Sequence, residues 1–281
     1  MKDGPMKYVF ATLACASIAA VIVICVFLFA RGVPAIAEIG LKEFLTGKVW
    51  RPGNDLYGIL PMILGSIYVT VGALIIGVPI GLLMAVFMAK FCPKWLYKIL
   101  KPVVNLLAGI PSIVYGLFGL TVVVPFIRDY IGGKGFSILG TSIILGMMIL
   151  PTIIGVSEAA IRAVPESYYE GALALGATKE ASVYRTVVPA AKSGIIAAVT
   201  LGIGRAIGET MAVKMIVGNQ ARIPDSILDG VRTLTSNIVL EMGYATDLHR
   251  EALIATGVIL FVFILIINVV IALTKRKQVN S

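Results

Sequence analysis

The ionisable residues Arg205, Glu209 and Lys214 lie in a single apolar stretch of the sequence. A charge in the hydrocarbon of a bilayer costs at least about 2.5–3.5 kcal/mol on insertion scales, so such residues usually line a pathway or pair with one another. Counted from Ser193 along a helix, Arg205 lies about 18 Å in, and Glu209 follows one turn later on nearly the same face. Lys214 lies on the opposite side near the end, where its long stem can reach the interface. The spacing predicts that Arg205 and Glu209 act as one unit without Lys214.

Two chemical roles fit a unit of Arg205 and Glu209. The guanidinium can bind the oxygens of a small oxyanion bidentately, and the carboxylate can neutralise it when no anion is present. The alternative is a structural ion pair that locks two helices together. We favour a role in transport. Gly204 and Gly208 have the GxxxG spacing of closely packed helices and not the spacing of a phosphate-binding loop.

Composition identifies the setting of these residues as a membrane. The chain has 281 residues, of which 58% are hydrophobic and 14% charged, with a mean hydropathy of +0.97. A soluble domain is about 25% charged. Charge-poor runs of about 20 residues predict an all-α protein with six membrane spans. They are Tyr8–Ala30, Leu60–Ala89, Val103–Ile127, Ile138–Ser157, Ser193–Gly218 and Glu251–Leu273. The first run is too long for a signal peptide.

Loop charges predict the orientation of the spans. The loop Lys90–Pro102 carries four lysines and no acid, and the C-terminal tail carries Lys275, Arg276 and Lys277. Basic loops stay in the cytoplasm, so both termini are expected there. The same rule accounts for the formal charge of +9 without a nucleic-acid partner.

The longest cytoplasmic connection, residues 158–192, is expected to be a rigid knob. Pro165 favours the start of a helix, and Gly176 can end it in the left-handed conformation. Thr178 is expected to cap a second helix that ends at Pro189. Such a knob could press into a groove of another protein, and an amphipathic hairpin on the bilayer surface fits the helix pattern equally well.

The sequence contains no catalytic set, no paired metal-ligand spacing and no nucleotide-binding loop. The three cysteines form no disulfide framework, and the single histidine, His249, is expected to be a solvated loop residue. We therefore expect no enzyme activity, no metal site and no cofactor. A protein of this kind that pumps solute must take its energy from a partner.

The knob resembles the EAA loop of prokaryotic ABC importer permeases. Glu170, Gly171 and Ala172 stand at the start of that motif, followed by Gly176 and by Pro189 at its end. The stretches Leu106–Gly116 and Gly204–Asn219 narrow the resemblance to the PstC-type family of phosphate importer permeases, over about residues 60–273. This resemblance implies the type I, MetI-like fold. It also implies that Arg205 and Glu209 act in phosphate passage and that the EAA-like residues dock on an ATPase.

The resemblance also implies partners and a domain plan. The partners are a second (PstA-type) permease, two (PstB-type) ATPase subunits, an extracytoplasmic (PstS-type) phosphate-binding protein, inorganic phosphate and the lipid of a prokaryotic plasma membrane. The expected units are an N-terminal helix and outer loop (1–59), the transporter domain (60–273) and a basic tail (274–281). A permease for molybdate or sulfate and an ATPase-independent channel or secondary transporter are the alternatives.

Overall fold

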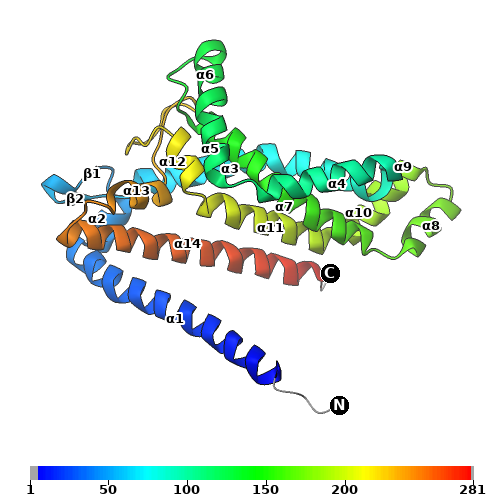
Figure 1. Cartoon of the computed structure of the whole chain (residues 1–281), viewed down its shortest axis with the longest axis horizontal. Helices are drawn as coiled ribbons and strands as arrows, with labels where there is room; N and C mark the ends of the chain where they lie inside the picture. Colours follow the sequence, from blue (N-terminus) through cyan, green and yellow to red (C-terminus); the bar gives the residue numbers. More distant parts are fainter. Residues whose placement is uncertain (1–5, 280–281) are drawn as a thin grey trace.

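Long apolar helices make up most of the chain, in agreement with its composition (Figure 1). The computed structural model describes residues 6–279, and of these the side chains of all but 271, 272 and 274–279. The side chains of the basic tail therefore lie outside the described residues. The long helices are α1 (Met6–Ile39), α3 (Leu60–Val86), α4 (Lys94–Gly109), α7 (Ile138–Arg162), α11 (Lys192–Gly208) and α14 (Asp247–Val279).

Short elements connect these helices. The α-helices among them are α2 (Leu41–Thr46), α5 (Ser112–Phe118), α6 (Val124–Phe126), α8 (Glu166–Ala174), α9 (Lys179–Ser182), α10 (Val188–Ala190), α12 (Met211–Ile216) and α13 (Leu234–Glu241). Strands β1 (Trp50–Arg51) and β2 (Leu56–Tyr57) pair antiparallel around the 3-10 turn η1 (Pro52–Asn54). Wider π-helical turns are η2 (Phe87–Phe91), η3 (Gly119–Val123), η4 (Ile127–Ile131) and η5 (Val183–Val187).

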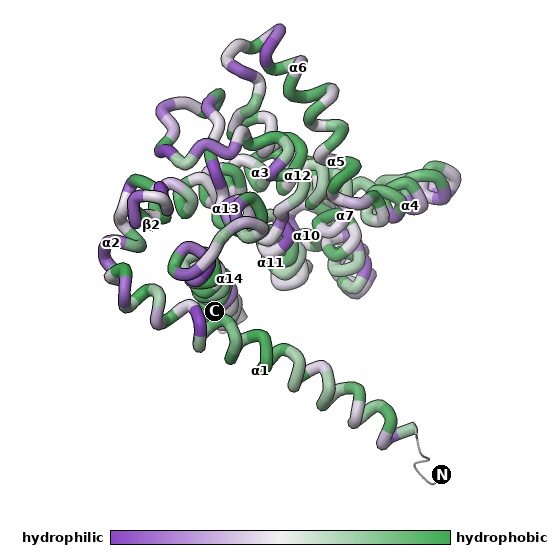
Figure 2. Tube along the Cα trace, turned by 60° about the vertical axis from the view of Figure 1, so that its left-hand side comes forward, coloured by the Kyte–Doolittle hydropathy of each residue, from purple (hydrophilic) through white to green (hydrophobic). Residues whose placement is uncertain are grey.

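Within the described residues, five helical segments are long and apolar enough to cross a membrane, and a bent pair that includes α11 can supply a sixth. The predicted spans Tyr8–Ala30, Leu60–Ala89, Ile138–Ser157 and Glu251–Leu273 all fall on such segments. The hydropathy along the backbone shows the same division, with polar residues gathered mainly at the loops (Figure 2).

The prediction that Val103–Ile127 forms one span is wrong. Helix α4 ends at Gly109, and a new helical segment runs from Ser112 to Ile131 in another direction (Figure 1). Pro111 is the cause, because its ring disfavours a helical conformation for the residue before it. Ile110 accordingly has an extended backbone, with φ −68° and ψ 124°.

The prediction of one continuous helix over Ser193–Gly218 is also wrong. Helix α11 ends at Gly208, Glu209 is extended with φ −69° and ψ 131°, and α12 begins at Met211. Backbone groups freed by a helix break need other partners in a dry interior. The Thr210 hydroxyl donates to the Gly208 carbonyl at 3.1 Å, and the Thr235 hydroxyl donates to the Glu209 carbonyl at 3.0 Å.

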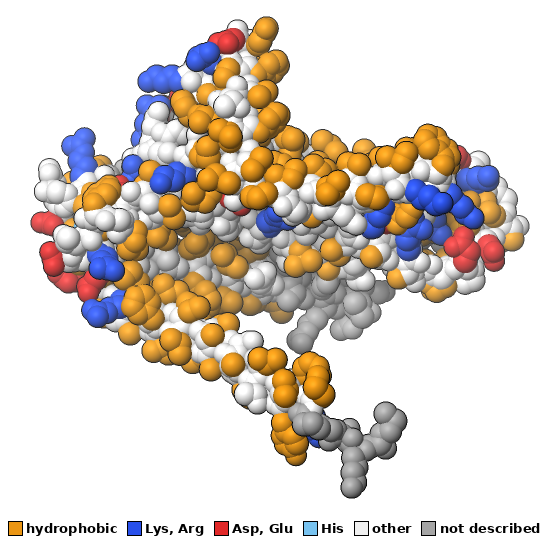
Figure 3. All heavy atoms as spheres, viewed as in Figure 1, with side chains coloured by type: hydrophobic (Ala, Val, Ile, Leu, Met, Phe, Trp, Pro, Cys, Tyr) orange, Lys and Arg blue, Asp and Glu red, His pale blue; other side chains and the backbone are white. Residues whose placement is uncertain are grey.

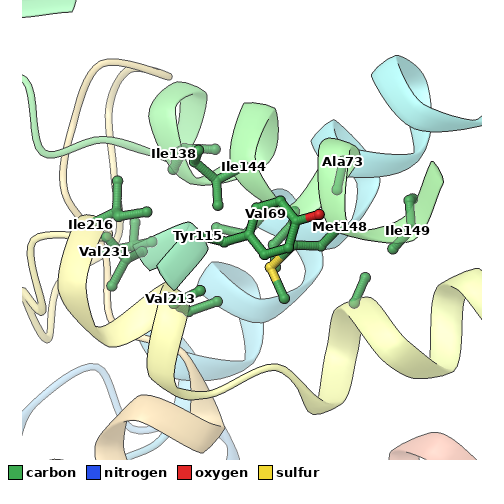
Figure 4. Packing of buried hydrophobic residues seen from close by; sticks show 14 of the residues in the cluster. Val69, Ala73, Tyr115, Ile138, Ile144, Met148, Ile149, Val213, Ile216 and Val231 are labelled. Carbon is green, nitrogen blue, oxygen red and sulfur yellow. The ribbon is translucent and has the colours of Figure 1, made fainter. Parts of the chain in front are cut away.

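The main core lies between α3, α7, α11 and α12 (Figure 4). Val69 and Ala73 of α3 meet Ile144, Met148 and Ile149 of α7 in this core. A side chain at Gly77 would bring its Cβ within 2.8 Å of Ile149 Cδ1, so glycine is what allows α3 and α7 to approach so closely. This pair of helices forms the rigid frame on which α11 lies.

Helix α1 diverges from the rest of the molecule (Figure 1). Only its C-terminal part packs on α14, where Phe29 and Phe261 meet edge to face at 6.0 Å between ring centroids. A Cβ at Gly32 would lie 2.6 Å from Val258 Cγ2, so this contact is close. Residues 6–24 are exposed throughout.

Candidate functional site

Arg205 lies in the last turn of α11 and is half-buried. Its Nη1 donates to the Thr152 hydroxyl of α7 at 3.4 Å. No carboxylate lies within salt-bridge distance of this guanidinium among the residues that the structure describes. The guanidinium therefore keeps most of its donors available for an anion.

Glu209 does not pair with Arg205, contrary to the arrangement expected for a continuous helix. Because α11 ends at Gly208, the extended backbone carries Glu209 away from the helical face of Arg205. Its Oε1 instead accepts from the backbone N–H of Ala212 at 3.1 Å, in the first turn of α12. Both residues still lie at the same interruption, because Arg205 belongs to the last turn of α11 and Glu209 lies in the break that follows.

The face of α11 that carries Arg205 is open. Leu201, Gly204, Arg205 and Gly208 share this face by helical spacing. Leu201, Gly204 and Gly208 are exposed, and a Cβ added at either glycine would meet nothing within 4 Å. The GxxxG pair therefore packs against no described part of this chain, and it leaves room for a substrate or another subunit beside Arg205.

The second helix break lies near the first. The Tyr115 hydroxyl of α5 donates to the Leu107 carbonyl of α4 at 3.0 Å, across the break at Ile110–Pro111. Tyr115 is also close enough to Arg205 for an electrostatic interaction with its charge. Helices α5 and α12 pack together, and Sδ of Met215 would lie 2.7 Å from a Cβ at Gly116. The two helix breaks therefore lie near the Arg205 guanidinium, and transporters bind charged substrates at interrupted helices of this kind.

The knob predicted between residues 158 and 192 forms as expected from Pro165 onward. Helix α8 follows Pro165 and ends at Ala174, two residues before Gly176, which has φ +85°. The Gly176 N–H donates to Leu173 O at 2.9 Å, and the Ala177 N–H donates to Ala172 O at 3.1 Å. This is the Schellman pattern of helix ends. The Thr178 hydroxyl caps α9 by accepting from Ala181 N at 3.2 Å.

The EAA-like residues lie on an outward surface at one end of the molecule. Glu170, Gly171, Gly176 and Pro189 are exposed, and Ala172 is half-buried. Charged side chains of both signs gather at this end (Figure 3). Leu175, immediately before the glycine turn, is 91% exposed. Past Pro189 the chain bends by 70° into α11, so the knob is joined directly to the helix that carries Arg205.

The sequence did not reveal a polar cluster at the opposite end. Glu241 of α13 accepts hydrogen bonds from Trp50 Nε1 at 2.8 Å and Arg232 Nη1 at 2.6 Å, and His249 Nε2 lies 2.9 Å from it. His249 is therefore a half-buried member of the hydrogen-bonded network around Glu241, and its interpretation as a solvated loop residue is wrong. The partners are separated by up to 191 residues, so no local pattern could have indicated the cluster.

Comparisons with known proteins agree with this architecture. The family described as "Binding-protein-dependent transport system inner membrane component" matches residues 77–279. A probable ABC transporter permease protein, YqgH of Bacillus subtilis, is 42% identical over 95% of this chain and 89% of its own length. The phosphate transport system permease protein PstC of Xylella fastidiosa is 32% identical over all of this chain and 95% of its own.

Solved structures show the same fold. A bacterial ABC transporter for the acidic polysaccharide alginate has a TM-score of 0.65 at 15% identity, covering 95% of each chain. The MetNI methionine ABC transporter has a TM-score of 0.60 at 20% identity, covering 82% of this chain and 99% of its own. The resemblance to an importer permease is thus confirmed. This multi-pass membrane protein belongs to the binding-protein-dependent transport system inner membrane components, as a permease subunit and not an enzyme.

Proposed function

We propose that this chain is a permease subunit of an ATP-driven importer and passes inorganic phosphate across the plasma membrane. The observation that carries the proposal is Arg205, whose guanidinium lies on an open helix face and, among the residues that the structure describes, has only a neutral hydroxyl as a partner. A desolvated guanidinium can hold a phosphate anion through two parallel hydrogen bonds. The similarity to PstC proteins supports phosphate as the substrate.

Glu209 has a different role in this proposal from the one its sequence spacing indicated. Its carboxylate caps the first turn of α12, at the break that follows Arg205. A negative charge there does not cancel the guanidinium directly, and it repels an anion that moves past Arg205 toward α12. Arg205 then supplies binding, and Glu209 limits how long the anion stays.

Energy for transport is supplied by a partner in this proposal. Glu170, Gly171, Ala172, Gly176 and Pro189 form the surface that docks on an ATPase, and the exposed Leu175 is its apolar contact. We further propose that the working complex has a second (PstA-type) permease, two (PstB-type) ATPase subunits and a (PstS-type) phosphate-binding protein. The ABC transporter relatives support partners of these general kinds.

The test replaces the charged residues of the passage in the assembled transporter. Arg205→Lys keeps the charge but loses the bidentate fork, so uptake of labelled phosphate should fall. Arg205→Gln should lower uptake by at least about ten-fold, because hydrogen bonds to charged groups are worth about 1.5–3 kcal/mol. The amount of assembled complex in the membrane should stay at the parental level in both variants.

The double variant Arg205→Gln/Glu209→Gln distinguishes a role of these two residues in phosphate passage from a purely structural role. Normal abundance without uptake supports the passage role, whereas uptake at the parental rate would refute it. Competition by molybdate or sulfate stronger than by unlabelled phosphate would indicate a permease for another oxyanion. Uptake that continues after ATP is depleted would indicate a channel or secondary transporter.

A further inference from the structure

A buried carboxylate lies near the end of α7, eight residues before α8 begins. The side chain of Glu158 is 2% exposed. Its Oε2 lies 2.7 Å from Lys101 Nζ of α4, and its Oε1 accepts from the Tyr97 hydroxyl at 2.7 Å and from Arg162 Nε at 2.9 Å. Such a group is costly to bury unless its partners are well placed, and here it has three. It ties α4 to α7 at a defined register.

The same cluster reaches the π-helical turn η2 at the end of α3. Nη2 of Arg162 donates to the Met88 carbonyl at 2.7 Å, and its guanidinium lies over the Tyr97 ring at 4.7 Å from the centroid. The contacts of Glu158 and Arg162 therefore join the ends of α3 and α7 to α4 in one network.

Turn η2 also contacts the knob. Lys90 lies 2.9 Å from the Glu166 carboxylate of α8 and over the Tyr169 ring at 5.2 Å. Phe91 stacks on Tyr184 of η5 with 6.4 Å between ring centroids. A shift of α8 or η5 consequently acts on η2, which the Glu158 cluster joins to α4.

Helix α4 leads from this cluster toward Arg205. Lys101 precedes the end of the helix at Gly109 by eight residues, or about 12 Å. Beyond it lies the break at Ile110–Pro111, which the Tyr115 hydroxyl bridges and which lies near Arg205. Contacts thus run from the knob through α4 to Tyr115, which interacts electrostatically with Arg205.

We propose that Glu158 is a positioning residue for transport. By holding Lys101 and Tyr97 it makes α4 follow the knob, so that movement of the knob on its partner reaches the helix break beside Arg205. The proposal rests on the proposed function, since it assumes an ATPase that moves the knob and phosphate that passes Arg205. The proposal adds a route that couples ATP hydrolysis to phosphate transport through residues outside the EAA-like motif.

The experiment uses the assembled transporter in proteoliposomes, with its ATPase subunits and binding protein and with inorganic phosphate as the probe. Lys101→Met removes the ionic link between α4 and α7 and leaves the Glu158–Arg162 pair in place. Lys98→Met, one turn earlier on the exposed face of α4, is the matched control. Glu158→Gln and Tyr97→Phe remove the other links.

The measured quantity is phosphate transported per ATP hydrolysed. It should fall about five-fold or more in Lys101→Met and in Glu158→Gln, within the range typical of coupling between sites, while ATP hydrolysis continues and the amount of complex is unchanged. Tyr97→Phe should lower it less, because it removes one neutral donor. Lys98→Met should keep the parental ratio.

Three results would overturn the inference while leaving the proposed function in place. One is an unchanged ratio in Lys101→Met, another is an equal loss in Lys98→Met, and the third is a loss of complex without a change in the ratio. If Glu158→Gln fails to assemble, Lys101→Met and Tyr97→Phe decide the matter. A parental complex that takes up no phosphate, or that binds no ATPase, would instead refute the proposed function.

Discussion

At the scale of single residues, the partner of Arg205 determines what its charge can do. A carboxylate would neutralise the guanidinium and compete with an incoming anion, whereas the hydroxyl of Thr152 orients it without removing its charge. Thr152 belongs to α7, so the rigid frame of α3 and α7 sets the position of Arg205. The sequence singles out Arg205 as an ionisable residue in an apolar stretch, but it could not identify this partner, which is 53 residues away.

Thr152→Val removes this hydroxyl and keeps the shape of the side chain. Phosphate uptake should fall about three- to five-fold, the effect of one modest hydrogen bond, while the amount of complex stays constant. Thr200→Val is the control, because the Thr200 hydroxyl bonds to its own helix at Ile196 O. Equal uptake in the two variants would show that the Thr152 contact does not matter for transport.

Glu241 gives a pH-dependent contribution to stability. Burial raises the pKa of its carboxyl, but hydrogen bonds from Trp50, His249 and Arg232 outweigh burial, and the pKa lies below its usual value. A lowered pKa means that the stabilisation is complete above the pKa of the unfolded chain, about 4.3, and is lost as pH falls through the folded value.

The expected result is a fall in unfolding temperature of the purified protein in detergent as the pH is lowered below about 4.3. Glu241→Gln should unfold at a lower temperature at neutral pH, because Arg232 loses its ionic partner, and it should lose less on acidification. The exposed Glu38→Gln provides the control. A variant at Glu241 with the parental pH profile would contradict the assignment.

At the scale of elements, the sequence predicts best where the signal is local. Pro165, Gly176 and Thr178 each act on their own turn, and all three behave in the structure as expected. The hydropathy of the sequence did not predict the breaks at Ile110–Pro111 and Glu209. Hydropathy measures how long an apolar stretch is, and it does not show where the helix within that stretch changes direction. Pro111 did carry a signal, but Glu209 is held in the break by the distant Thr235.

Gly176→Val tests the end of α8. Valine tolerates the left-handed conformation poorly, so the turn should be strained by about 1–3 kcal/mol. Uptake should fall while insertion into the membrane stays normal, and less ATPase should co-purify with the complex. Gly53→Val is a suitable control, since Gly53 has neither a positive φ nor a neighbour within 4 Å of an added Cβ. Full ATPase association with substrate-coupled hydrolysis in Gly176→Val would contradict docking at this turn.

At the scale of the whole molecule, the two ends differ in a way that fits the predicted orientation. Lys101 contacts Glu158 near the last turn of α7, and the Asp229 carbonyl accepts from Ile138 N at its first turn. The 25 residues of α7 span about 37 Å, so Lys101 and Asp229 lie at opposite ends of a membrane-length helix.

Reporter fusions can check this orientation. A reporter fused after Lys101 should be cytoplasmic, because the lysine-rich loop that precedes it stays inside. A reporter fused after Asp229 should lie outside the cytoplasm. Both reporters on the same side would show that the order of spans is wrong.

The attachment of α1 has a consequence for biosynthesis. Within the described chain, the long helix that α1 packs against is α14, which begins at Asp247. Roughly 200 residues separate the end of α1 from that helix, so at about 5–20 residues per second the ribosome needs on the order of 10–40 s to make its partner. During this time α1 must remain in the bilayer as a lone helix. The exposed surface of residues 8–24 is apolar, and an apolar helix surface is stable in contact with lipid. The first span can therefore stay in the bilayer without protein contacts until the last span has been synthesised.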